Sequence, residues 1–376
     1  MPNWGLLACL GVVLAVVVTA CDVANDESRN VEVGVWEYFV RDPDPAAARQ
    51  KMTEATEAGF KAVITNSFWE PGRTEPTREE ITELRNAAAA ADEMGVRPLL
   101  IVQSPGSQTT PNTPELREEF TAFAAALARE LPAYRSFIIG NEPNLNRFWL
   151  PQFAPDGENV AARDYLELLA ASYDALKAVS PDIRVIGGAL APRGGDDPQS
   201  SRPTHSPTQF IRDMGRFYRE SGRDRPVMDA FAHHPYLERS DLPPDFEHPN
   251  TTTISLADYD KLVDLLEEAF DGTAQEGGDL PILYTEFGVQ TEIPPDKLAV
   301  YTNQTSPVAR DAVPEETQAE YYRQAFELVC DQDTVEGLYI FHVWDEPDLA
   351  GWQSGPYYAD RTPKSSRAAL ADLPSC

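Results

Sequence analysis

The feature of this sequence that most constrains its fold is the alternation of eight short β-rich runs with longer helical runs. Most of the β-rich runs are continuously apolar, as expected of strands that are covered on both faces. Eight such pairs close most simply into one barrel, so we expect an α/β protein with a single (β/α)8 TIM barrel. The expected strands are residues 31–39, 62–67, 98–103, 136–140, 183–187, 228–233, 281–286 and 337–343.

The helix ends and the connections support this fold and give the barrel a direction. Thr77-x-x-Glu80 and Ser255-x-x-Asp258 are typical of capping boxes at helix N-termini. Connections after helices are short, whereas long loops of residues 191–206, 237–254 and 289–314 follow strands five, six and seven. Long loops at the carboxyl ends of barrel strands are where this fold builds its functional sites.

The first 20 residues contain no charged side chain, and residues 6–18 are apolar. This pattern predicts a secretory signal peptide. Residues 18–21 read Val-Thr-Ala-Cys, which resembles a bacterial lipobox and implies lipidation of Cys21; ordinary cleavage is the alternative. We therefore expect a signal peptide over 1–20, a polar tether over 21–30 and one catalytic domain over 31–376. The product would lie outside the cytoplasm, lipid-anchored to the bacterial cell membrane or secreted.

The predicted export determines which cysteines remain as free thiols and in which compartment they lie. Once Cys9 is cleaved away and Cys21 carries lipid, Cys330 and Cys376 are the remaining thiols. In an oxidising compartment we expect them to form a disulfide, although two unpaired cysteines remain the alternative.

The charge balance limits the partners. With 61 acidic and 31 basic side chains the chain has a formal charge of −30, which disfavours nucleic acids and anionic lipid surfaces. It also disfavours strongly anionic polysaccharides, unless local charges in the loops override it. Nothing in the sequence indicates the oligomeric state.

Two glutamates stand at the ends of opposite strands. The fourth strand runs into Asn141-Glu142-Pro143, and the seventh ends in Thr285-Glu286. Strands four and seven face each other across a barrel, so both carboxyl groups should reach one pocket. Hydrolysis of a glycosidic bond with retention needs two carboxyl groups about 5 to 5.5 Å apart.

Paired in this way, the two segments resemble glycoside hydrolase clan A, the 4/7 superfamily of retaining β-glycosidases, over residues 31 to about 370. The resemblance implies that Glu142 is the general acid/base, that Glu286 is the nucleophile and that Asn141 contacts the 2-hydroxyl of the sugar. It implies an oligo- or polysaccharide substrate and no cofactor. Because Glu142 must start protonated, we expect its pKa to be raised relative to that of Glu286.

Further binding residues follow from the same resemblance. His234-x-Tyr236 at the end of strand six is similar to the clan's His-x-Tyr, in which the tyrosine holds the nucleophile and the histidine reaches the sugar. Trp344 after strand eight is the implied sugar platform. Packing under a loop is the alternative for each of them. Three other tryptophans in loops after strands could serve further subsites or anchor the rim: Trp69, Trp149 and Trp352.

The sequence departs at two positions from the pattern of glycoside hydrolase family 5. Typical family 5 members carry arginine after strand two and histidine after strand three, where this chain has Asn66-Ser67 and Gln103-Ser104. A cellulase-like or family 39-like branch therefore fits better.

Two other functions remain as alternatives. A non-catalytic sugar-binding lipoprotein is one alternative. A metal-dependent hydrolase is less favoured, because His233 and His234 should point to opposite sides of their strand and strand one has no His-x-His, so we expect no metal site.

Overall fold

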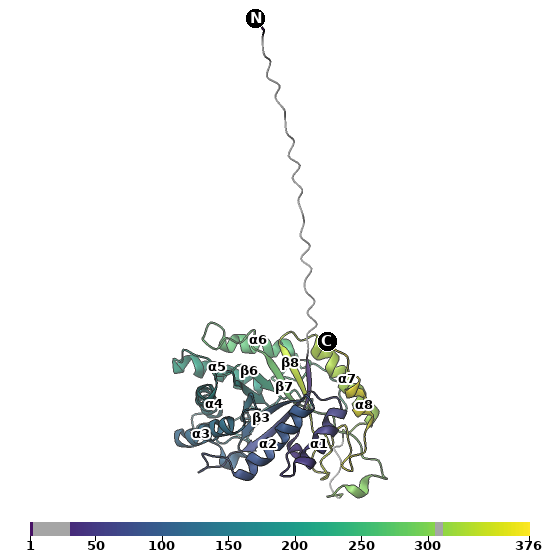
Figure 1. Ribbon diagram of the computed structural model, residues 1–376. Coiled ribbons are helices and arrows are strands. Elements are labelled where there is room, and N and C mark those ends of the chain that lie inside the picture. The colour runs from purple at the N-terminus through teal and green to yellow at the C-terminus, as the bar shows by residue number, and fades with distance from the viewer. Residues whose placement is uncertain (3–30, 305–310) are drawn as a thin grey trace.

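The computed structural model describes residues 1–2, 31–304 and 311–376. Eight parallel strands form a closed barrel in sequence order, and the helices surround it (Figure 1). The barrel closes where β1 pairs with β8, from Glu32 opposite Gly337 to Trp36 opposite Phe341. The expected single (β/α)8 barrel is confirmed.

The strands lie within a few residues of their expected positions. Their bounds are β1 Glu32–Trp36, β2 Ala62–Phe68, β3 Arg97–Gln103, β4 Ser136–Ile139, β5 Arg184–Leu190, β6 Ala230–His233, β7 Ile282–Phe287 and β8 Val335–Phe341. The helices are α1 Pro45–Glu57, α2 Arg78–Glu93, α3 Pro114–Glu130, α4 Val160–Val179, α5 Pro207–Ser221, α6 Tyr259–Phe270, α7 Glu315–Cys330 and α8 Ser365–Ala371, with short 3₁₀ turns at Tyr38–Val40, Ser107–Thr109 and Leu298–Val300.

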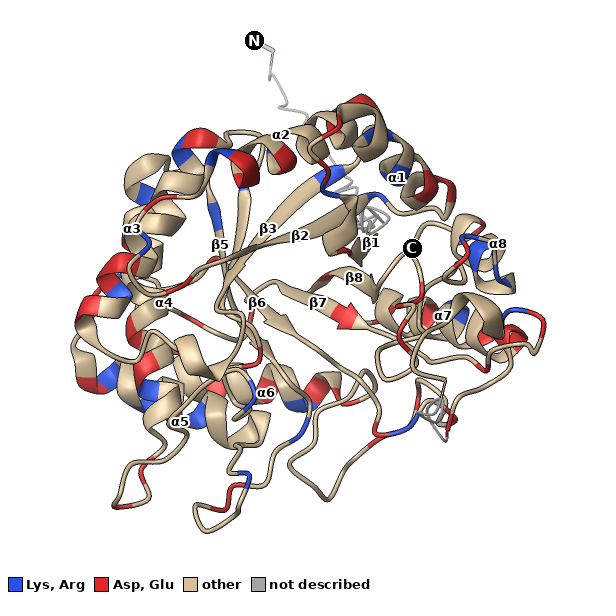
Figure 2. Ribbon diagram, turned by 90° about the horizontal axis from the view of Figure 1, so that it is seen from below, with Lys and Arg blue, Asp and Glu red and all other residues tan. Residues whose placement is uncertain are grey.

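Two apolar layers explain why the strands are continuously hydrophobic. One set of strand side chains fills the barrel interior and includes Ile64, Leu99, Ile138 and Leu283. The other set packs outward against the helices. Figure 2 shows the acidic and basic residues mostly on the surrounding helices and loops, with few on the strands. Because strand neighbours alternate between the two layers, both faces of the sheet are largely apolar.

One of the two expected capping boxes is wrong. Thr77 caps α2 as expected, since its hydroxyl accepts the Glu80 N–H at 3.1 Å. The helix α6, by contrast, begins only at Tyr259. Ser255 and Asp258 lie in the preceding turn, where the Asp258 carboxylate accepts both the Ser255 N–H and the Ser255 hydroxyl at 2.8 Å. That carboxylate is also bound to His248, so it organises the loop before α6 and does not cap the helix.

A disulfide ties the last residue of the chain to the end of α7. Cys330 is bonded to Cys376, with their Cα atoms 5.4 Å apart and a sequence separation of 46. In the chain-entropy model a loop of this length stabilises the folded protein by about 3 to 4 kcal/mol. We expect reduction to lower the free energy of unfolding by that amount, measured by urea unfolding with and without dithiothreitol. A Cys330→Ser, Cys376→Ser double variant should match the reduced protein and not respond to the reductant.

All but the first two residues of the predicted signal peptide, and the whole tether with Cys21, fall within residues 3–30, outside the described residues. Within the part of the chain that the structure describes, no helix combines the length and apolar character needed to cross a bilayer.

Candidate active site

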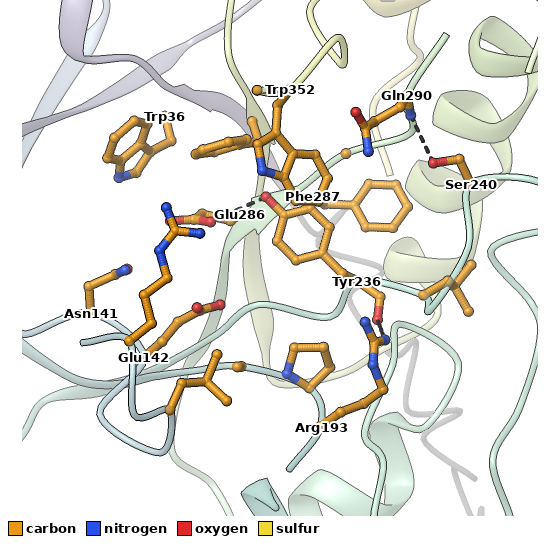
Figure 3. A pocket seen from close by; sticks show the side chains of 18 of the residues that line it. Trp36, Asn141, Glu142, Arg193, Tyr236, Ser240, Glu286, Phe287, Gln290 and Trp352 are labelled. Carbon is orange, nitrogen blue, oxygen red and sulfur yellow. Dashed lines mark hydrogen bonds between the residues drawn. The ribbon is translucent and has the colours of Figure 1, made fainter. Parts of the chain in front are cut away.

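A cavity of about 850 Å³ opens at the carboxyl ends of the barrel strands. Its floor carries Asn141, Glu142 and Glu286, and Tyr236 stands at its side (Figure 3). The loops after β5, β6 and β7 contribute to its walls, as the long connections in the sequence predict. The volume lies within the range of about 300 to 1,000 Å³ that is usual for small-molecule sites.

The two glutamates meet in this cavity. One carboxylate oxygen of Glu142, one of Glu286 and a ring nitrogen of His234 all lie within 4.8 Å of one another. Figure 3 shows both carboxylates directed into the same space, with Asn141 beside Glu142. This spacing fits the separation of about 5 to 5.5 Å between the two carboxyl groups of a retaining pair.

A tight turn after β4 positions Glu142. Gly140 and Glu142 both have positive φ angles, of 78° and 41°, and the Glu142 N–H donates to the carbonyl of Ala189 at 2.8 Å. A positive φ is unfavourable for a residue with a side chain and persists only where the surroundings impose it, commonly at functional sites. Here the bond to β5 imposes it, and the turn sends the carboxylate into the cavity.

His234 is packed against the two acids and is not among the residues that line the cavity, so its contact with the sugar stays a prediction. Its Nδ1 is 3.1 Å from Glu142 Oε1 and 3.6 Å from Glu286 Oε2, and the residue is 1% exposed. Burial alone would lower the pKa of this imidazole, but the charges of Glu286 and Glu142 outweigh burial and raise it. The two carboxylates therefore favour the charged form of His234.

Tyr236 lies where the resemblance implies. Its hydroxyl donates to Glu286 Oε2 at 3.2 Å. Burial and the negative charge of Glu286 raise the pKa of the phenol well above 10, so it remains a donor. The bond fixes the orientation of the Glu286 carboxylate.

Burial raises the pKa of Glu286 to about 7; His234 opposes this rise, and the charge of Glu142 adds to it. We expected a raised pKa on Glu142 relative to Glu286, whereas the structure raises that of Glu286, because this residue is part of strand β7 and only 7% exposed. The Tyr236 hydroxyl and His234 oppose the rise and favour the ionised carboxylate.

Asn141 borders the cavity next to Glu142. Its amide oxygen is buried without a hydrogen-bond partner among the described residues. The side chain is thus not committed to the protein framework, which suits a group that binds a ligand hydroxyl.

Trp344 is not the platform that the resemblance implied. Its indole N–H donates to Glu54 at 2.6 Å, the Arg361 guanidinium lies 4.9 Å from its ring centre, and it does not line the cavity. The chain turns at His342, whose φ is 76°, and carries Trp344 away toward α1. Trp69 and Trp149 are likewise buried outside the cavity.

Other aromatic side chains line the cavity instead. Trp36, Phe341, Trp352 and Tyr236 form a continuous wall, with neighbouring ring centres 5.0 to 5.7 Å apart. Trp352 was one of the three candidate rim tryptophans, but Trp36 was missed. Its place at the end of the first strand could have identified it, because strand ends face the site in this fold.

The sequence matches no protein-family model and no curated protein. Several solved structures are similar. A GH39 enzyme from Xanthomonas axonopodis pv. citri has a TM-score of 0.56 at 16% identity, covering 92% of this chain and 66% of that chain. A β-glucosidase from Exiguobacterium marinum has a TM-score of 0.57 at 16% identity, covering 91% and 96%. A GH39 β-xylosidase from Caulobacter crescentus has a TM-score of 0.55 at 17% identity, covering 92% and 71%. At these identities the likeness concerns the fold: this chain has a (β/α)8 barrel similar to those of known glycoside hydrolases.

Proposed function

We propose that this protein is a retaining glycoside hydrolase that cleaves β-linked glycosides or polysaccharides by double displacement. The observation that carries the proposal is the pair of carboxylates of Glu142 and Glu286, which lie within 4.8 Å in one cavity. The fold likeness to β-glucosidase and GH39 β-xylosidase structures is consistent with this class of reaction.

In the first step Glu142 donates its proton to the glycosidic oxygen, and a Glu286 carboxylate oxygen attacks the anomeric carbon. The bond to the leaving sugar breaks, and a glycosyl ester of Glu286 forms. In the second step Glu142, now ionised, takes a proton from water, and the resulting oxygen attacks the anomeric carbon. The ester bond breaks, Glu286 regains its negative charge, and Glu142 is protonated again.

The neighbouring side chains have definite tasks in these steps. Tyr236 orients the attacking carboxylate, and Asn141 offers its amide to a hydroxyl of the bound sugar. The Trp36 and Trp352 rings present flat apolar surfaces that suit the C–H face of a pyranose, and their π systems modestly stabilise developing positive charge.

The test is a panel of aryl β-glycosides and plant or microbial polysaccharides, with the first product observed by proton NMR. We expect the β-anomer to form first and to equilibrate later. Initial release of the α-anomer would exclude double displacement. Saturable oligosaccharide binding without release of reducing sugar over days would instead support the sugar-binding alternative.

The raised pKa of Glu286 gives the reaction a pH dependence. Glu286 attacks as a carboxylate, and its pKa of about 7 leaves it increasingly protonated below that value. We expect kcat/KM to fall about tenfold for each unit of pH below about 7. Initial rates between pH 4 and 9 check this expectation, and a rate that stayed constant from pH 7 down to pH 4 would contradict it.

The same atoms also support a second candidate function. Two carboxylates and an imidazole within 4.8 Å could hold a divalent cation and activate a water molecule for hydrolysis. Dialysis against EDTA separates the two candidates. Double displacement by the two glutamates predicts unchanged activity, whereas a metal-dependent hydrolase would lose activity and recover it with added metal.

A further inference from the structure

Arg193 is a charged group of the cavity that the proposed reaction does not use. It lies in the loop after β5, and the backbone on its N-terminal side is fixed. The Ala191 N–H donates to Asn144 Oδ1 at 2.9 Å, and the Pro192 carbonyl accepts the Ile254 N–H at 3.0 Å. Figure 3 shows the Arg193 side chain beside Tyr236. Its guanidinium is therefore presented from a fixed part of the cavity wall.

The guanidinium has few partners. One of its nitrogens donates to the Tyr236 carbonyl at 3.1 Å. Within residues 31–304 and 311–376, no carboxylate lies within 4.0 Å of it. The acid Glu238 acts on it electrostatically but is bound to His248 at 2.9 Å. The neighbouring Arg239, by contrast, is neutralised by Asp241 through two bonds of 2.6 and 2.7 Å.

A partly buried arginine without a bonded carboxylate is unusual in this protein. The chain has about twice as many acidic as basic residues, and arginines elsewhere in the described structure commonly contact a carboxylate. Burial lowers the pKa of Arg193, while the charges of Glu238 and Glu142 oppose this, and the guanidinium remains cationic at neutral pH. A partly buried charge without a directly bonded counter-ion is costly unless a ligand supplies one.

We infer that the substrate carries an anionic group, a carboxylate or a sulfate ester, which the Arg193 guanidinium binds. Planar guanidinium groups pair with such oxyanions through two parallel hydrogen bonds. Arg193 lines the same cavity as Glu142 and Glu286, so the anionic group belongs to a sugar bound beside the reacting bond. This inference rests on the proposed function and names its substrate class.

The negative charge of the whole protein does not oppose this contact. Surface charges more than about 8 to 10 Å away are largely screened at physiological ionic strength, whereas a bonded pair is screened much less. Arg147, from the loop after β4, is a second cation that lines the same cavity. A short-range attraction at this wall can therefore select an anionic sugar against the overall repulsion.

The test uses two matched pairs of disaccharides built on the glycone accepted in the screen above. In one pair the leaving sugar is glucose or glucuronic acid, and in the other the accepted glycone is compared with its uronic acid counterpart. We expect kcat/KM to favour the uronic acid substrate at least tenfold in one of the pairs, as for hydrogen bonds to a charged group. Arg193→Gln should abolish the preference by slowing only the anionic substrate, and Arg193→Lys should retain part of it. Arg202→Gln, which changes an exposed arginine of the same loop, should leave the preference intact.

Binding measurements keep the inference testable without turnover. Calorimetric titration of the unaltered protein with glucuronate, glucose 6-sulfate and glucose should show at least tenfold tighter binding of one or both anions, and their order distinguishes carboxylate from sulfate. Equal binding of all three, or an unchanged substrate preference in both Arg193 variants, overturns the inference. If neutral glycosides are still hydrolysed with retention, the proposed function stands. Loss of retention would overturn the proposed function itself.

Discussion

Replacing Glu286 with glutamine is expected to lower kcat by about 10⁴-fold or more, because the amide cannot form the glycosyl ester on which both steps depend. The Tyr236 hydroxyl can still donate to the amide oxygen, so the cavity should keep its shape. The measurement is turnover of an aryl β-glycoside. Glu292→Gln, an exposed position in the following loop, is the matched control and should keep full activity.

Azide reports the role of this residue independently of the rate. In Glu286→Ala the small anion can occupy the place of the missing carboxylate and attack the anomeric carbon once, from the same side. The expected product is the α-glycosyl azide. A β-azide from this variant would assign Glu286 the role of acid/base instead.

The Glu286→Gln variant should also be more stable than the parent. In the parent the pKa of Glu286 is raised from the ordinary value of 4.5 to about 7, so between pH 4.5 and about pH 7 the folded protein holds a proton that the unfolded chain releases. The free energy of unfolding therefore falls as pH rises through this window, by about 1.4 kcal/mol for each unit of pKa shift. At pH 8 we expect Glu286→Gln to recover on the order of 1 to 3 kcal/mol, measured by urea unfolding. An equal gain at pH 4 would point to another cause.

Replacing Glu142 with alanine is the second large expected effect. Loss of general acid/base catalysis typically costs about 10²- to 10⁴-fold, and the loss should be greatest for poor leaving groups. A dinitrophenyl glycoside, whose leaving group needs no proton, should form the ester nearly as fast as before and then accumulate it. Burst kinetics measure this directly.

Azide should restore turnover of the accumulated Glu142→Ala ester and give the β-glycosyl azide, because it attacks from the side that water normally uses. An α-product, or equal rate losses for activated and unactivated leaving groups, would contradict the role of Glu142. Together, the two alanine variants should give products of opposite configuration.

Much of the fold could be predicted from hydrophobic runs alone. Each barrel strand is buried on two sides, so runs such as 98–103 and 136–140 identify strands that differ by about one residue from β3 and β4. The start of α6 was misplaced because Ser255 and Asp258 have the residue types of a capping box but bond to each other and to His248. A capping box and this turn before α6 use the same two residue types. Only the bond between Asp258 and His248, which the sequence motif does not include, distinguishes them.

Site residues next to strands were predicted better than residues in loops. Glu142, Tyr236 and Glu286 follow directly from the ends of β4, β6 and β7, where the barrel determines which way the chain points. The direction of Trp344 depends on the left-handed turn at His342, which no residue type in that segment announces. Trp352 reaches the cavity only because the long loop after β8 folds back over Phe341.

The electrostatics of the site were the least accessible to sequence reasoning. The resemblance implied a raised pKa on Glu142, yet the pKa that the structure raises is that of Glu286, through its burial and against the opposing charge of His234. Arg193 belongs to no recognisable sequence motif. Its proposed role depends on the finding that no carboxylate among the described residues contacts its guanidinium. Such properties arise from distances between loops that are remote in the sequence.

The closed pairing of β1 with β8 has a consequence for dividing the molecule. A cut in the loop between β5 and α5 would place Glu142 on one fragment and Glu286 on the other, and each half would expose two unpaired sheet edges. Under the proposed mechanism, neither half could hydrolyse a glycoside alone. Turnover recovered on mixing the two halves would therefore measure how much of the closed barrel has reassembled.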